Sequence, residues 1–197
     1  MRKLGAIAPF LLFFSLAAQA QLPTGGNVFF GYSYSRGNVF TKNIASPVPV
    51  DPGIGLNGWE ASLEGKFLPW IGVVADFDWH YGSHTIRPGC VPPACTSVAP
   101  IHLNASRHEL MFGPRVSVSV GKYTPFAHLL LGFAHQSDSG GSISNSDTTF
   151  ATAFGGGLDY KLIKGIAARA QLDSIHTNFF DSGRNNLRFS LGIAFKF

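Results

Sequence analysis

Hydrophobic and polar residues alternate strictly in the segment NNLRFSLGIAFKF, residues 185–197. Every second position from Leu187 to Phe197 is apolar, and the positions between them are small or charged. A period of two is typical of a β-strand whose two faces meet different surroundings. One face of this strand must therefore lie against an apolar medium and the other against a polar one.

The same alternation recurs along the rest of the chain. Besides the last strand, we expect strands at about 28–35, 58–67, 71–81, 104–117, 124–135, 148–160 and 165–176. The register of the fifth is poorly defined, because Leu129, Leu130 and Leu131 make both of its faces apolar. Pro114 is unusual within the fourth, since proline cannot donate a hydrogen bond to a neighbouring strand.

The segments between these strands alternate in length. Longer segments are expected at 36–56, 82–103, 136–147 and 178–186, and short turns near 68–70, 119–122 and 161–164. Long loops at one end and short turns at the other are typical of outer-membrane barrels. A soluble lipocalin-like barrel or a sandwich would alternate in the same way.

Aromatic residues favour the membrane barrel over these soluble alternatives. They gather at two levels near the strand ends, as the interfacial girdles of a membrane protein require: Tyr34, Trp59, Trp79 and Tyr81 at one level, and Phe67, Trp70, Tyr123, Tyr160 and Phe197 at the other. Composition agrees, because the chain has 23 Gly and 18 Phe but only 13% charged residues. We predict an all-β fold, an eight-stranded antiparallel up-and-down transmembrane β-barrel closed between its first and last strands.

The N-terminus has the features of a secretory signal peptide. Arg2 and Lys3 precede an apolar run, 4–18, that is followed by the small-residue cleavage pattern Ala18-Gln19-Ala20. A transmembrane anchor would need about 20 apolar residues. We therefore expect a cleaved signal peptide at 1–20 and a barrel domain at 21–197. Cleavage leaves 13 basic against 11 acidic residues, so the sequence pI of about 9.2 does not indicate a nucleic-acid partner.

Charged residues fall on the face opposite the apolar one. Eight strands enclose an interior only wide enough for side chains. We expect the charged side chains to plug this lumen as a network of ion pairs and hydrogen bonds; a narrow ion or small-solute channel is the alternative. The predicted network consists of Glu60, Glu64, Lys66, Asp76, Asp78, Arg107, Glu109, Arg115, Asp159, Arg169, Asp173, Arg188 and Lys196.

The mature chain resembles the small eight-stranded outer-membrane barrels of the OmpA, OmpX and opacity-protein group. The resemblance rests on NVFFGYSYS in the first strand, on FATAFGGGLDYKL, and on the last strand ending in Phe197. It implies a place in the bacterial outer membrane, contact with outer-membrane lipid, and recognition by the barrel assembly machinery, with Phe195 and Phe197 as the assembly signal. We expect a monomer that displays surface loops to an unknown extracellular ligand.

The cysteines and histidines suggest further chemistry. Cys90 and Cys95 fall in the second long loop, outside a reducing compartment, so we expect a local disulfide rather than a metal site. Five histidines fall near the long-loop ends and could offer imidazoles to zinc or copper: His80, His84, His102, His135 and His176. Their interfacial position explains them equally well, so we expect neither a metal nor a cofactor.

One segment bears on catalysis. Ile175-His176-Thr177-Asn178 is faintly similar to the His-x-Ser-Asn pattern of the lipid A deacylases. No serine stands at the nucleophile position, and no glutamate follows Glu109. Because a catalytic triad needs all three groups within hydrogen-bond reach, we do not expect an enzyme, and a lipid-modifying activity is a remote alternative.

Overall fold

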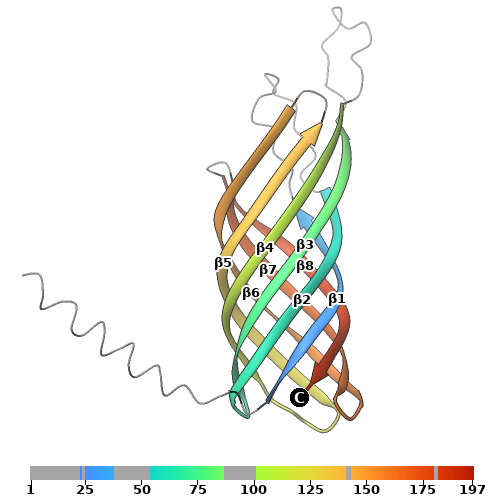
Figure 1. Cartoon of the computed structure of the whole chain (residues 1–197), viewed down its shortest axis with the longest axis vertical. Coiled ribbons are helices and arrows are strands. Elements are labelled where there is room, and N and C mark those ends of the chain that lie inside the picture. Colours follow the sequence, from blue (N-terminus) through green and yellow to red (C-terminus); the bar gives the residue numbers. More distant parts are fainter. Residues whose placement is uncertain (1–22, 24, 38–53, 87–100, 141–142, 180–181) are drawn as a thin grey trace, which may run out of the picture.

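The computed structural model describes residue 23 and residues 25–37, 54–86, 101–140, 143–179 and 182–197 (Figure 1). Each strand pairs antiparallel with the next, and β8 pairs with β1 to close the barrel. In this part of the chain, no helix has the length and hydrophobicity needed to cross a membrane. The strands are β1 (Gly25–Gly37), β2 (Ile54–Leu68), β3 (Ile71–Ile86), β4 (Ile101–Ser117), β5 (Tyr123–Gly140), β6 (Ile143–Ile163), β7 (Ile166–Phe179) and β8 (Ser182–Lys196).

Closure extends to the last residue of the chain. The β1–β8 ladder runs from Arg36↔Leu187 to Asn27↔Lys196. Beyond it, the Gly26 amide donates to the Phe197 carbonyl at 3.0 Å, and the Phe197 amide donates to the Gly26 carbonyl at 3.1 Å. The predicted eight-stranded barrel and its closing strand pair are confirmed.

Side chains alternate between the outside of the barrel and its lumen, as predicted. In β1, Phe30 is 58% exposed and the adjacent Phe29 is fully buried. In β8, Leu187, Phe189, Leu191, Ile193 and Phe195 project outward, whereas Arg188 and Ser190 are buried. The apolar face is therefore the outer wall, and it is this wall that meets lipid.

A row of aromatic and imidazole side chains lies at one edge of the apolar band on the outer wall. On the outer wall Trp59 lies 5.9 Å from Phe30 and 6.5 Å from Trp79, measured between ring centroids. The row continues through His108, whose ring centroid lies 4.5 Å from that of Trp79, to His135, whose ring centroid lies 6.3 Å from that of His108. Amphipathic rings at one level are typical of a membrane interface.

Beyond this row, β3 to β6 rise above the other strands, at the end away from the C-terminus (Figure 1). Their outward side chains there are polar: Ser83, Asn104, Ser106, Ser137, Ser139, Ser144, Ser146 and Thr148. We call this four-stranded extension the polar wall. The opposite end, where short connections follow β2, β4 and β6, is the short-turn end.

The structure corrects two of the predicted long segments. β5 ends at Gly140 and β6 begins at Ile143, so most of the segment expected at 136–147 is strand. In the same way β7 ends at Phe179 and β8 begins at Ser182, within the segment expected at 178–186. These residues lie beyond the apolar band, where the outward face of a strand is polar as well as the lumen face, so they lack the alternation that marks the other strands.

The lumen also contains an apolar layer that the sequence did not predict. Leu130 points inward, while Leu129 and Leu131 project outward, which settles the register of β5. Leu130 packs in the lumen with Val74, Met111, Ala134, Ala151, Ala153 and Ile175. Pro114 lies on the outer wall, where it pairs with Val73. The register between β4 and β5 is the same on both sides of it, so the strand accommodates the proline.

Candidate functional site

Arg188 lies at the centre of the lumen and binds acidic side chains from three other strands. Its Nε and Nη2 donate to Asp173 Oδ2 at 3.0 and 2.7 Å. Its Nη1 donates to Asp76 Oδ1 at 2.8 Å and also to Asp78, and Glu60 Oε2 lies 3.7 Å from Nε. All five side chains are buried, so one guanidinium group is the shared counter-charge of four acids.

A second group of contacts lies on the side of Arg188 toward the polar wall. Arg107 Nε lies 2.9 Å from Glu109 Oε1, and the guanidinium also donates to Ser35. His80 is buried between Asp78, 3.0 Å from its Nδ1, and Ser33, 2.9 Å from its Nε2. His80 was grouped with histidines near the loop ends, and this placement corrects it: its side chain lies in the lumen.

The remaining cations lie at the short-turn end. Arg169 donates to both carboxylate oxygens of Asp159, at 2.7 and 3.1 Å, and Lys196 Nζ lies 3.1 Å from the same carboxylate. Arg115 donates to Glu64 at 3.3 Å. Lys66 donates to Ser117 at 2.7 Å. The structure thus places all thirteen predicted network residues in the lumen, with Lys66 and Lys196 at its short-turn mouth.

Several neutral residues of this network were missed by the sequence analysis. His128 joins two charged groups, since its Nδ1 lies 3.3 Å from Arg115 Nη2 and its Nε2 lies 2.7 Å from Asp173 Oδ1. Gln171 donates to Glu60 at 2.7 Å and to Asp173 at 3.0 Å. Gln171 alternates in phase with the charged lumen residues Arg169 and Asp173 of its own strand, a signal that a register-based search for polar residues would have found. His128 lies in β5, whose register the sequence left undefined.

The remaining candidates are the histidines and cysteines considered as metal ligands or as a disulfide. Within the described residues no three potential metal ligands form a group that could hold an ion. His135 and His176 are exposed. His135 Nδ1 lies 2.7 Å from Thr148 Oγ1, and His176 Nδ1 lies 2.7 Å from Asn185 Oδ1. Cys90 and Cys95 lie outside the described residues, as does the His84 side chain, so the disulfide stays a prediction.

The segment that resembles the lipid A deacylases is split between two faces. His176 is exposed on the outer wall, whereas Thr177 is buried in the lumen and accepts a hydrogen bond from Asn186 at 3.3 Å. Adjacent residues on opposite faces of a strand cannot act as a base and its nucleophile. The prediction that the chain is not an enzyme stays a prediction.

A groove lies beside the aromatic row, on outward-facing residues of β2 to β5. Its volume is about 630 Å³. It is lined by Gly55, Asn57, Tyr81, Gly82, Ser83, Asn104, Ala105, Ser106, Ser137 and Ser139. The lining offers hydroxyl and amide groups and one phenol, but no charged side chain, so it suits a neutral ligand that forms hydrogen bonds.

Comparison with known families decides what kind of barrel this is. The sequence profile of the outer membrane protein beta-barrel domain matches residues 6–197. This chain belongs to that family. It is therefore a bacterial outer-membrane protein, and in such barrels the short turns face the periplasm and the other end faces outward from the cell. A search of curated proteins found no match.

Solved structures of other outer-membrane proteins share the fold. Ail, the attachment invasion locus protein of Yersinia pestis, solved in complex with the heparin analogue sucrose octasulfate, has a TM-score of 0.58 at 18% identity. The match covers 88% of this chain and 98% of Ail. Neisserial surface protein A gives 0.53 at 8% identity, over 87% and 95% of the two chains. The N-terminal barrel domain of Pseudomonas aeruginosa OprF gives 0.51 at 13%, over 90% and 100%.

Proposed function

We propose that this outer-membrane barrel is an interaction protein, whose polar wall is displayed at the cell surface and whose lumen is closed to solutes. The observation that carries the proposal is the continuation of β3 to β6 beyond the aromatic row, with hydrogen-bonding side chains on its outer face. Apolar residues would be expected there if the strands served only to span lipid. The extension adds a paired, polar surface outside the bilayer.

The groove at the base of this wall supports a partner of a particular chemistry. Sucrose octasulfate, the ligand in the Ail structure, is a polyanion, but the groove of this chain is lined by neutral side chains. Protein sites for polyanions typically contain Lys or Arg side chains. Tyr81 offers a ring face and Asn57 and Asn104 offer amide groups, a combination that suits an uncharged, hydroxyl-bearing ligand such as a neutral saccharide.

The packing of the lumen supports closure to solutes. Arg188 and its acidic partners cross the interior from β8 to β2, β3 and β7, and Gln171 and His128 fill the spaces between them. The apolar layer around Leu130 occupies the opposite side. A solute could pass only if these contacts were broken together, which favours a plugged barrel over the alternative of a narrow channel.

Display of the wall is tested by labelling single cysteines on intact cells with a membrane-impermeant maleimide. In a Cys90→Ser, Cys95→Ser background, we expect Ser139→Cys and Ser106→Cys to be labelled, because both positions lie on the outer face of the wall. The matched control is Ser119→Cys, exposed at the short-turn end, which should be labelled only after the outer membrane is permeabilised. Labelling of Ser119→Cys alone on intact cells would contradict the proposed display.

A further inference from the structure

A pocket lies inside the lumen at its periplasmic mouth and has a volume of about 190 Å³. Its six ionisable side chains come from five strands, and their charges do not balance. Four are cationic, Lys66, Arg115, Arg169 and Lys196, and two are anionic, Glu64 and Asp159. The lining side chains therefore carry an excess of two positive charges. Asp159 is shared between Arg169 and Lys196.

The two arginines of the pocket are buried against the same aromatic ring. The Arg115 guanidinium carbon lies 4.3 Å from the centre of the Phe126 ring, and that of Arg169 lies 4.8 Å from the same centre. Two like charges buried against one ring repel each other, and nearby negative charge offsets that repulsion. Glu64, at 3.3 Å from Arg115, is the sole acidic hydrogen-bond partner of that arginine among the described residues.

Both guanidinium groups also have a buried N–H without an acceptor. Arg115 Nε and Arg169 Nη1 make no hydrogen bond, although both side chains are almost fully buried. Arginine is a donor at every nitrogen, so only an acceptor can satisfy these atoms. A buried donor without an acceptor is unfavourable. An anion with several oxygens would supply acceptors and negative charge together.

We infer that this pocket binds a small oxyanion with the size and charge of phosphate. Arg115 and Arg169 donate to it from inside the lumen, and Lys66 and Lys196 attract it at the mouth, where their side chains are 23% and 34% exposed. The site does not depend on the proposed role of the wall, which lies at the other end of the barrel. The anion comes from free phosphate or from a phospholipid headgroup at the same membrane surface.

The test is an NMR titration of the ¹⁵N-labelled full barrel in a phosphate-free detergent, at constant ionic strength set by sodium chloride. One arm adds inorganic phosphate and a second adds a short-chain phosphatidylglycerol. We expect saturable shifts of amides lining the pocket, such as those of Asn27 and Ser117, and none in the wall. Saturation by phosphate identifies the free anion as a ligand, and saturation by the lipid alone identifies the headgroup.

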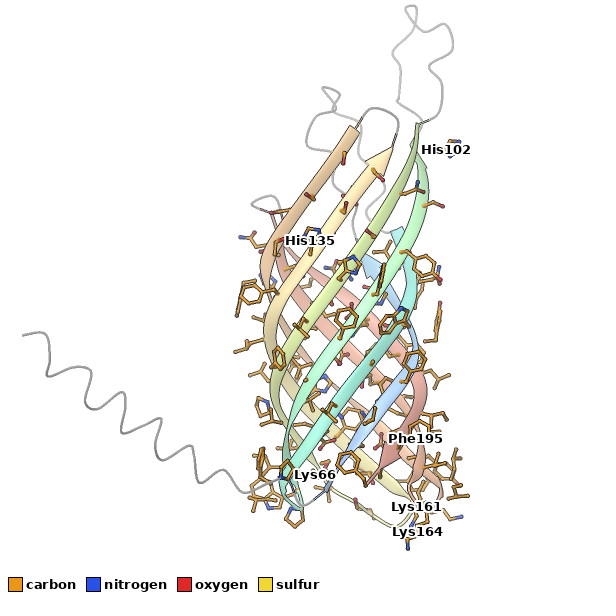
Figure 2. The ribbon with its side chains drawn as sticks, in the orientation of Figure 1. Lys66, His102, His135, Lys161, Lys164 and Phe195 are labelled. Atoms are coloured by element: carbon orange, nitrogen blue, oxygen red, sulfur yellow. The ribbon has the colours of Figure 1, made fainter. Side chains whose placement is uncertain are left out.

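Lysine variants decide whether the pocket is the site. Lys196→Met and Lys66→Met should each weaken binding about tenfold, the loss expected for one charge-assisted hydrogen bond. The matched control is Lys164→Met, an exposed lysine at the same end that does not line the pocket and should leave binding unchanged (Figure 2). The inference is overturned if neither arm saturates at these amides, or if all three variants bind as the wild type does.

Discussion

Arg188→Met should lower the free energy of unfolding of the barrel by about 3–5 kcal/mol, the range for removing one partner from a buried ion pair. Among the residues that the structure describes, Arg188 is the only arginine or lysine in contact with Asp76 and Asp173. The imidazole of His128 also lies beside Asp173. Without it, these acids and their neighbours remain buried and mutually repulsive. Urea unfolding in detergent, followed by the mobility shift of folded against boiled protein on a gel, measures the loss.

The matched control for this prediction is Arg36→Met, which removes an exposed arginine from β1. An exposed substitution of this kind should change the free energy of unfolding by no more than about 0.5 kcal/mol. Adding Asp173→Asn and Asp78→Asn to Arg188→Met should recover part of the stability, because neutral amides need no counter-charge. If Arg188→Met unfolds at the same urea concentration as Arg36→Met, the lumen network does not hold the barrel together.

Replacing Phe197 by alanine should reduce assembly in the outer membrane far more than replacing Phe195 by alanine. The family resemblance implies that the terminal aromatic is part of the signal recognised by the assembly machinery. Thermodynamics alone predicts the opposite order. Phe197 is 71% exposed and Phe195 is 50% exposed, so Phe195 loses more contacts when it is truncated. For either variant the direct loss of stability should be on the order of 1–2 kcal/mol.

The two readouts must therefore be measured separately. The amount of each variant in the outer-membrane fraction reports on assembly, and unfolding of purified, refolded barrel reports on stability. We expect Phe197→Ala to be scarce in the membrane and yet at least as stable as Phe195→Ala once folded. Equal amounts of the two variants in the outer membrane would mean that Phe197 only completes the closing strand, through its backbone bonds to Gly26.

Sequence alone predicted the membrane-spanning strands well because lipid imposes a simple rule on them. In β8 each outward residue from Leu187 to Phe195 must be apolar, so the alternation reveals both the strand and its faces. The rule fails where the lumen is also apolar. Leu130 packs against Met111 inside the barrel, and its run of three leucines therefore carried no signal for register.

The parts beyond the bilayer were harder to predict, because water accepts polar residues on both faces of a strand. Ser137, Ser139, Ser144 and Ser146 have the composition of a loop, yet they lie in paired strands. The phase of each charged residue along its strand predicted that its side chain lies in the lumen. The contacts between these side chains could not be predicted, because a contact such as Arg188 with Asp76 joins residues 112 positions apart, across the closed barrel.

Planar-bilayer recording of the purified wild-type protein tests the proposed closed lumen most directly. The side chains that cross the interior around Arg188, together with the apolar layer around Leu130, should block the passage of ions. We predict that the protein inserts and gives no steady single-channel conductance. Large, steady currents from the same preparation would contradict the closed lumen and identify the barrel as a channel.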